Sequence, residues 1–155
     1  EKFETWLGGI IQPHEPFYLA GQSNEQLKKV LERIAAIGYE KQVREAFVVT
    51  YATQKSPQVN KDAVHQNAAA FTIVDVRNPS EVKQKTIFPN AINIPLGNLR
   101  QRIGEIPDGK PILVHCAGGY RSAAASSLIR TQLQPNVEVL DLGEAVKSFE
   151  PQLKS

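Results

Sequence analysis

The sequence predicts an α/β protein in which a parallel sheet is flanked by helices. Short apolar segments typical of buried strands recur along the 155 residues. They lie at 16–20, 43–51, 71–76, 91–94, 112–115 and 137–140. Segments with helical spacing of apolar residues separate most of them, and this alternation produces parallel strands joined by crossover helices. A chain of this length also buries a core without disulfides.

The first expected unit, residues 1–51, contains a strand, a helix and a second strand. Ser23 and Gln26 have the spacing of a capping box, with Ser23 as the N-cap. The helix at 24–37 carries an apolar stripe, so it should pack on a sheet. Gly38 stands where a C-cap glycine belongs.

The second expected unit, residues 60–155, follows a linker at 52–59 that lacks periodicity and contains a proline. Its helices are expected at 60–69, 80–85, 98–106, 122–133 and 144–149. Asn60 and Asn98 are the candidate N-caps of the first and third of these helices, because asparagine side chains accept hydrogen bonds from helix N-termini.

Composition excludes several classes of protein. Hydrophobic residues make up 41% and charged residues 22%, as in globular domains. The 18 Lys and Arg against 16 Asp and Glu give a net charge of +2, so neither nucleic acid nor a membrane is the expected partner. No stretch approaches the ~18 apolar residues of a membrane span. The sequence lacks methionine, which indicates a piece of a longer protein.

Cysteine and histidine usage bears on location and metals. Cys116 is the single cysteine, so no internal disulfide or cysteine-rich zinc site is possible, and a reducing cytoplasmic location is expected. The three histidines, His14, His65 and His115, lack metal-ligand spacing, so we expect no metal and no cofactor. His115 lies on a predicted buried strand, where a core histidine is expected rather than a general base.

Cys116 ends a predicted buried strand and begins a loop that leads directly into a helix. The loop consists of Ala117, Gly118, Gly119, Tyr120, Arg121 and Ser122. Ligands of parallel sheets bind beyond the carboxyl ends of the strands. Two glycines let the backbone wrap so that N–H groups face inward as an anion nest, and the helix start and an arginine add positive charge. These features favour the thiolate form of Cys116, which is the nucleophile. The alternative, a structural core cysteine, leaves the glycines and the arginine unexplained.

Three motifs occur in order within residues 60–150. They are Asp75-Val76-Arg77 with Glu81, the segment Ala91-Ile92-Asn93-Ile94-Pro95, and the loop from Cys116 to Ser122. Together they resemble the rhodanese family of sulfurtransferases. The resemblance implies a rhodanese-like three-layer domain at 60–155. Lys85–Phe88 replaces the family's Gly-His-Ile, and Asp141–Val146 replaces its Gly-Gly-Trp pattern, so the substrate preference stays open.

Residues 1–51 also resemble part of this family, namely a partial, degenerate rhodanese domain. Pro16–Gly21 aligns with Pro111–Cys116, so Gly21 stands at the cysteine position. This similarity reflects either a true repeat or the general pattern of α/β proteins. A degenerate domain before an active one is similar to the C-terminal part of metallo-β-lactamase–rhodanese fusion proteins. The resemblance implies an upstream metallo-β-lactamase-like domain in the parent chain.

The resemblance implies two-step sulfur transfer. The Cys116 thiolate attacks the sulfane sulfur of thiosulfate or a low-molecular-weight persulfide, and a thiophilic acceptor, cyanide or a thiol, then takes the sulfur from the Cys116 persulfide. Small-molecule donors and acceptors are therefore the expected partners.

The same resemblance assigns supporting roles around the cysteine. Arg121 would bind an anionic donor, and Tyr120 would shape the loop. Asp75 would either anchor the loop or cap a helix. Arg77 and Glu81 are expected to form a structural pair.

Two other functions fit part of the pattern. A sulfur-binding or regulatory module, loaded by a fused persulfide dioxygenase domain, would need the same cysteine loop without turnover. A cysteine phosphatase also has a strand-end cysteine followed by an arginine. Its loop is longer by one residue than Ala117–Tyr120, which leaves room for a phosphate.

Overall fold

The structure is a computed structural model that describes residues 3–51, 57, 59–134 and 136–149. It divides into two compact units, residues 1–55 and 56–155. Most of the linker predicted at 52–59 lies outside the described residues. In the part of the chain that the structure describes, no helix has the length and apolar character needed to cross a membrane.

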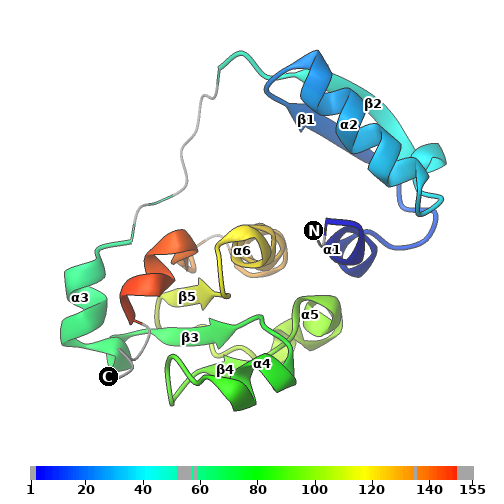
Figure 1. Cartoon of the computed structure of the whole chain (residues 1–155). Helices are drawn as coiled ribbons and strands as arrows, with labels where there is room; N and C mark the ends of the chain where they lie inside the picture. The colour runs from blue at the N-terminus through cyan, green and yellow to red at the C-terminus, as the bar shows by residue number, and fades with distance from the viewer. Residues whose placement is uncertain (1–2, 52–56, 58, 135, 150–155) are drawn as a thin grey trace. The chain divides into compact units, whose positions relative to one another are not determined.

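Unit 1 is built on two parallel strands. Its elements are α1 (Phe3–Ile10), β1 (Phe17–Gly21), α2 (Asn24–Ala35), the short 3₁₀ helix η1 (Glu40–Gln42) and β2 (Val43–Val48). β1 pairs with β2, and α2 packs along both strands (Figure 1). The predicted strand, helix and strand are confirmed, although β2 ends at Val48 rather than at Tyr51. Helix α1 was not predicted from the sequence.

The start of α2 differs in detail from the predicted capping box. Ser23 Oγ accepts the Gln26 N–H at 3.2 Å, as expected for an N-cap. The Gln26 side chain, however, accepts the N–H of Gln22 at 2.7 Å, one residue before the N-cap. Beyond the helix, Gly38 has φ 75°, a left-handed conformation that glycine adopts without a Cβ clash.

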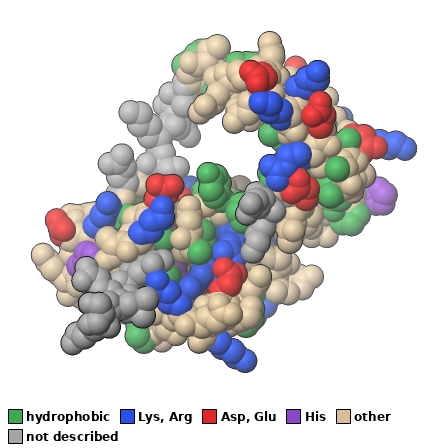
Figure 2. Space-filling view, viewed as in Figure 1, with side chains coloured by type: hydrophobic (Ala, Val, Ile, Leu, Met, Phe, Trp, Pro, Cys, Tyr) green, Lys and Arg blue, Asp and Glu red, His purple; other side chains and the backbone are tan. Residues whose placement is uncertain are grey.

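A side-chain pair joins the two helices of unit 1. Arg33 Nε and Nη2 donate to the Glu4 carboxylate at 2.6 and 2.9 Å. The hydrogen bond from Arg33 lowers the pKa of Glu4 to about 2. The Arg33 guanidinium also lies 5.2 Å from the centre of the Phe3 ring. Figure 2 shows acidic and basic side chains intermixed on the visible face of this unit.

Unit 2 contains a four-stranded parallel sheet. The strands are β3 (Thr72–Asp75), β4 (Ile92–Asn93), β5 (Ile112–His115) and β6 (Val139–Asp141). Their order is β4-β3-β5-β6, and Figure 1 shows β3 and β5 side by side with the same direction. The described helices are α3 (Lys61–Gln66), α4 (Pro79–Gln84), α5 (Leu99–Arg102) and α6 (Tyr120–Gln132). The predicted α/β fold class is confirmed.

Short 3₁₀ helices complete unit 2. They are η2 (Ala68–Ala70), η3 (Leu96–Asn98), η4 (Ile103–Glu105) and η5 (Gly143–Phe149). The single helix predicted at 98–106 is therefore wrong: α5 passes into η4, and Asn98 makes no side-chain cap. Gly104 lies in this stretch, and glycine disfavours a continuous α-helix by ~1 kcal/mol. The helix predicted at 144–149 is also 3₁₀.

The core of unit 2 fixes the end of β5. Ile112, Leu113 and Val114 are 0% exposed. A cluster of buried side chains packs around Leu113; its other members are Val64, Ile73, Ile87, Phe88, Leu140, Leu142 and Val146. Because helix α6 packs on β5 and β6, the loop between β5 and α6 is anchored at both ends.

Candidate active site

Cys116 is the first residue after β5, at the carboxyl end of the strand. It is 1% exposed. The Gly119 N–H donates to its Sγ at 3.1 Å, and the thiol lies 3.6 Å from Ser122 Oγ. The loop thus folds back over the sulfur and supplies one backbone donor to it. The sequence predicted several N–H groups facing the sulfur, and the Gly119 N–H is one that does so. The contribution of the helix α6 dipole stays a prediction.

Gly119 gives the loop its tight turn. It has φ 96° and is the N-cap residue of α6. A Cβ built on it would lie 3.3 Å from both the Glu144 nitrogen and the Gly143 carbonyl carbon. Ser122 Oγ donates to the Gly119 carbonyl at 3.0 Å. The turn therefore depends on glycine both for its backbone conformation and for its close approach to η5.

Arg121 pairs with Glu81, from the N-terminal part of α4. Its Nη1 lies 2.6 Å from Glu81 Oε2, and its Nη2 lies 2.8 Å from Oε1. The hydrogen bond to Glu81 raises the pKa of Arg121, against the effect of burial. Glu81 Oε2 also accepts the Asn78 N–H at 3.0 Å and so helps to cap α4. The predicted pairing of Glu81 with Arg77 is wrong, because the Glu81 carboxylate binds Arg121 instead.

Arg77 instead pairs with Asp75, and both side chains are buried. The Asp75 carboxylate accepts from the backbone N–H of Arg77 at 3.0 Å and from its Nη2 at 2.6 Å. Neither role predicted for Asp75, anchoring the cysteine loop or capping a helix, matches these partners. The pair spans the turn after β3. Removing one partner of a buried pair of this kind costs about 3–5 kcal/mol.

Asn93 is a further supporting residue, and its role was not predicted from the sequence. Its Nδ2 donates to the carbonyl oxygens of Asp75 and Arg77, each at 2.9 Å. It therefore ties β4 to the turn that carries the Asp75–Arg77 pair. The sequence feature that could have indicated this role is the single amide side chain within the otherwise apolar segment 91–94.

His115 lies at the end of β5, next to the cysteine, and is 0% exposed. Its ring packs edge-on against Phe88, with the ring centres 5.1 Å apart. Its Nε2 lies 3.6 Å from Asp75 Oδ2. Burial lowers the pKa of His115, against the opposing effect of the Asp75 carboxylate. These surroundings agree with the predicted core histidine, which stays neutral at pH 7.

This histidine should make stability dependent on pH. The unfolded chain takes up a proton at His115 at a higher pH than the folded chain, so acid favours unfolding. We expect the free energy of unfolding to be fully retained above the ordinary histidine pKa and to fall as the pH is lowered below it. Urea titrations of wild type and His115→Leu between pH 5 and pH 8 measure this dependence.

The leucine variant should show a weaker pH dependence than wild type over this range. The matched control is His14→Asn, because His14 is exposed and has φ 71°, which asparagine tolerates. It should keep the wild-type slope. An unchanged slope in His115→Leu would rule out His115 as the source.

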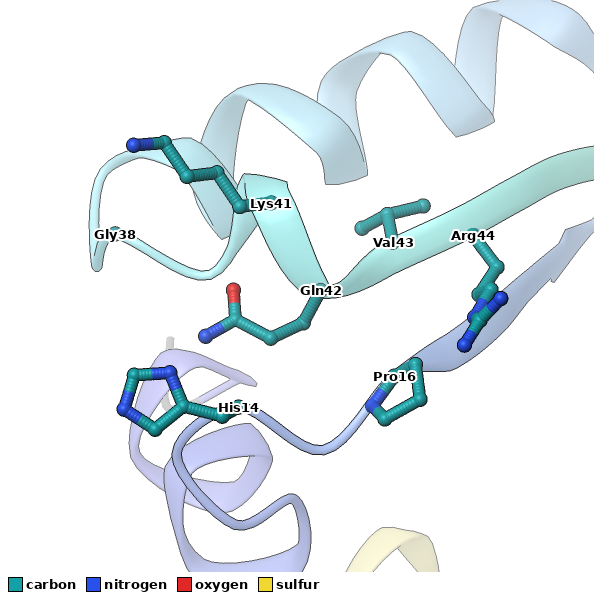
Figure 3. Close-up of a pocket in the computed structure, with 7 residues that line it drawn as sticks. All are labelled: His14, Pro16, Gly38, Lys41, Gln42, Val43 and Arg44. Carbon is teal, nitrogen blue, oxygen red and sulfur yellow. The ribbon is translucent and has the colours of Figure 1, made fainter.

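Unit 1 has a hollow of its own with a different lining. Its volume is about 550 Å³, and it is lined by His14, Pro16, Gly38, Lys41, Gln42, Val43 and Arg44 (Figure 3). It lies where β1 and β2 begin, whereas Cys116 lies where β5 ends. The unit 1 position aligned with Cys116 is Gly21, where a Cβ would come within 2.7 Å of Leu27 Cδ2. Unit 1 therefore lacks a sulfur at that position, and a side chain there would require Leu27 to move.

The geometry of unit 2 defines a class of protein. It is an α/β domain in which a buried cysteine follows a parallel strand and lies under a glycine turn that begins a helix. The family described as the rhodanese-like domain matches residues 56–145, and the chain belongs to this family.

Related proteins match part of this chain. An uncharacterized protein of Bacillus subtilis, YqhL, is 40% identical over 58 residues, which are 37% of this chain and 45% of that protein. A sulfurtransferase of Allochromatium vinosum is 33% identical over 60 residues, 39% of this chain and 55% of that protein. The chain thus spans about half the length of these relatives.

A solved structure shows the same fold. It is a rhodanese-related protein from Thermoplasma volcanium, 30% identical, with a TM-score of 0.52. The match covers 59% of this chain and 88% of that one. The predicted rhodanese-like fold is confirmed.

Proposed function

We propose that this protein is a sulfurtransferase that carries sulfane sulfur on Cys116. The donor is thiosulfate or a low-molecular-weight persulfide, and the acceptor is cyanide or a thiol. The observation that carries the proposal is the placement of Cys116 Sγ at the end of β5, with the Gly119 N–H donating to it at 3.1 Å. Membership of the rhodanese-like family and the similarity to a protein named a sulfurtransferase support it.

The reaction needs no neighbouring base. The Cys116 thiolate attacks the sulfane sulfur, a new S–S bond forms, and the donor's own S–S bond breaks. Its electron pair leaves with sulfite or with the donor thiolate. The acceptor then attacks the outer sulfur, giving thiocyanate or a new persulfide, and the Cys116 thiolate is restored. The Gly119 N–H stabilises the negative charge on sulfur in both states.

The burial of Cys116 adds a requirement for turnover. A side chain that is 1% exposed cannot contact a donor until the loop moves outward. Ala117 and Tyr120 are exposed, so this part of the loop faces solvent rather than the core. The loop therefore opens for the donor and encloses the persulfide, which protects it from water and from unwanted thiols.

Mass spectrometry of the intact protein tests the proposal. The chain is treated with thiosulfate, or separately with a low-molecular-weight persulfide, and then with cyanide. We expect one added sulfur per chain, located on Cys116, and its loss as thiocyanate. Failure of every donor to load Cys116 would overturn the proposed function, whereas loading without release would favour the non-turnover module.

For unit 1 we propose a scaffolding role beside a metallo-β-lactamase-like domain of the same parent chain. Its β1–α2–β2 arrangement is similar in order to β5–α6–β6, which supports descent from a rhodanese-like half-domain. The glycine at the cysteine position supports its lack of sulfur chemistry. In this proposal, unit 1 supports the partner domain structurally, and unit 2 carries the sulfur.

A shortened chain tests this division. The fragment beginning at Ser56 contains every residue of the Cys116 site and forms a compact unit. We expect it to fold and to keep kcat/KM for sulfur transfer within about twofold of the full chain, because domains with their own core fold alone. Circular dichroism and thiocyanate formation are the measurements. A folded but inactive fragment would show that unit 1 contributes to the site.

A further inference from the structure

We infer that Glu81 sets donor selectivity at the Cys116 site: by neutralising Arg121, it favours persulfides with uncharged tails over thiosulfate and other anionic donors. The inference rests on the proposed sulfurtransferase function and adds the substrate class to it. It also replaces the expectation that Arg121 binds an anionic donor.

The geometry of the pair carries the argument. Both Nη atoms of Arg121 face both oxygens of Glu81, at 2.6 and 2.8 Å, in the two-pronged arrangement that binds a carboxylate most strongly. The Arg121 side chain is 13% exposed and that of Glu81 is 32% exposed. The guanidinium edge that would hold a sulfonate or carboxylate of a donor therefore already holds a carboxylate of the protein.

The other basic side chains near Cys116 also lack an unbalanced positive charge. Arg77 is paired with Asp75, at 2.6 Å. Burial lowers the pKa of His115, so at neutral pH it adds no positive charge. Each arginine of the site thus has its own carboxylate, and the attacking Cys116 thiolate is itself negative. A dianionic donor such as thiosulfate meets this thiolate without an unmatched arginine to offset the repulsion.

A donor with an uncharged tail avoids this difficulty. It brings its sulfane sulfur to Cys116 without competing for Arg121 and without losing the hydration of a charged tail. An anionic donor must displace Glu81 from Arg121 or be bound without that contact. The transfer step is the same for both classes, so the difference lies in binding and approach.

Glu81→Gln is the informative change. Glutamine keeps the length of the side chain, and its Oε1 can still accept the Asn78 N–H, since both Glu and Gln serve in capping boxes. The change removes the charge that neutralises Arg121. The matched control is Glu105→Gln, because Glu105 forms an equivalent pair with Arg102, at 2.8 and 2.7 Å, on the surface of the same unit.

Three donors are compared, with cyanide as the acceptor. They are thiosulfate, the persulfide of 3-mercaptopropionate, which has an anionic tail, and 2-hydroxyethyl persulfide, which has an uncharged tail of similar size. The kcat/KM of the wild-type protein should be about tenfold higher with 2-hydroxyethyl persulfide than with the persulfide of 3-mercaptopropionate. This ratio corresponds to a difference of ~1.4 kcal/mol in activation free energy. In Glu81→Gln, kcat/KM for both anionic donors should rise about 3- to 10-fold, and that for the uncharged donor should stay within about twofold.

The outcomes separate this inference from the proposed function. Glu105→Gln should leave all three values unchanged. A uniform change for all donors in Glu81→Gln, or no gain for the anionic ones, would overturn the inference while Cys116 still accepts sulfur. The wild-type preference is measured without any variant, so equal use of the two organic persulfides would overturn the inference even if Glu81→Gln failed to fold. No sulfur on Cys116 from any donor would instead overturn the proposed function.

Discussion

Cys116→Ser should fold and should form no thiocyanate from any donor, a loss of ~10³-fold or more in kcat/KM. Cys116 is the single cysteine of the chain, so no other thiol can take over the sulfur. A serine hydroxyl is far less nucleophilic than a thiolate toward sulfane sulfur, and it cannot form a persulfide. The Gly119 N–H can still donate to the serine oxygen, which is why the fold should persist.

Thiocyanate release and thermal unfolding of this variant are measured together. The matched control is Ala123→Ser, which introduces the same residue at an exposed position of α6 and should retain wild-type activity. Substantial thiocyanate formation by a folded Cys116→Ser protein would remove Cys116 from the role of nucleophile.

The Cys116 loop was predictable because its signals are local. The buried segment at 112–115, two glycines and a following segment rich in alanine and serine are contiguous in the sequence, and the structure places them as β5, the loop and α6. The parallel sheet followed from the alternation of strands and helices. These features depend on neighbours in the chain, which a single sequence contains.

The partner of Glu81 was not predictable in the same way. Arg77 and Glu81 have the i, i+4 spacing of a helical pair, but α4 begins at Pro79, so Arg77 lies before the helix and turns to Asp75. The true partner, Arg121, lies 40 residues away. It comes close only because β3 and β5 are neighbours in the sheet, which brings the segments that follow them together at one edge.

Helix α1 shows another limit. Gly8 and Gly9 disfavour a helix, so propensity alone does not predict one there. Tertiary contacts offset this cost: Glu4 pairs with Arg33 of α2, and the Phe3 ring lies against the same guanidinium. Interactions between elements cannot be inferred from either segment alone.

Gly119→Ala should cause the second large loss of activity, about 10²-fold in kcat/KM, with about 1–3 kcal/mol lost from the free energy of unfolding. Alanine at φ 96° is strained, and its Cβ would lie 3.3 Å from backbone atoms of Gly143 and Glu144. The backbone must shift to relieve both effects. That shift moves the Gly119 N–H away from Cys116 Sγ, so the thiolate and the persulfide lose a donor.

The neighbouring glycine provides a matched control for this loss. A Cβ on Gly118 would meet no atom within 4 Å, and Gly118 does not have a positive φ. Gly118→Ala should therefore lose less than about threefold in kcat/KM and should unfold like wild type. Thiocyanate formation and urea unfolding distinguish the two variants. Equal losses in both variants would mean that any side chain in the loop is harmful, and that the turn at Gly119 has no special role in holding the sulfur.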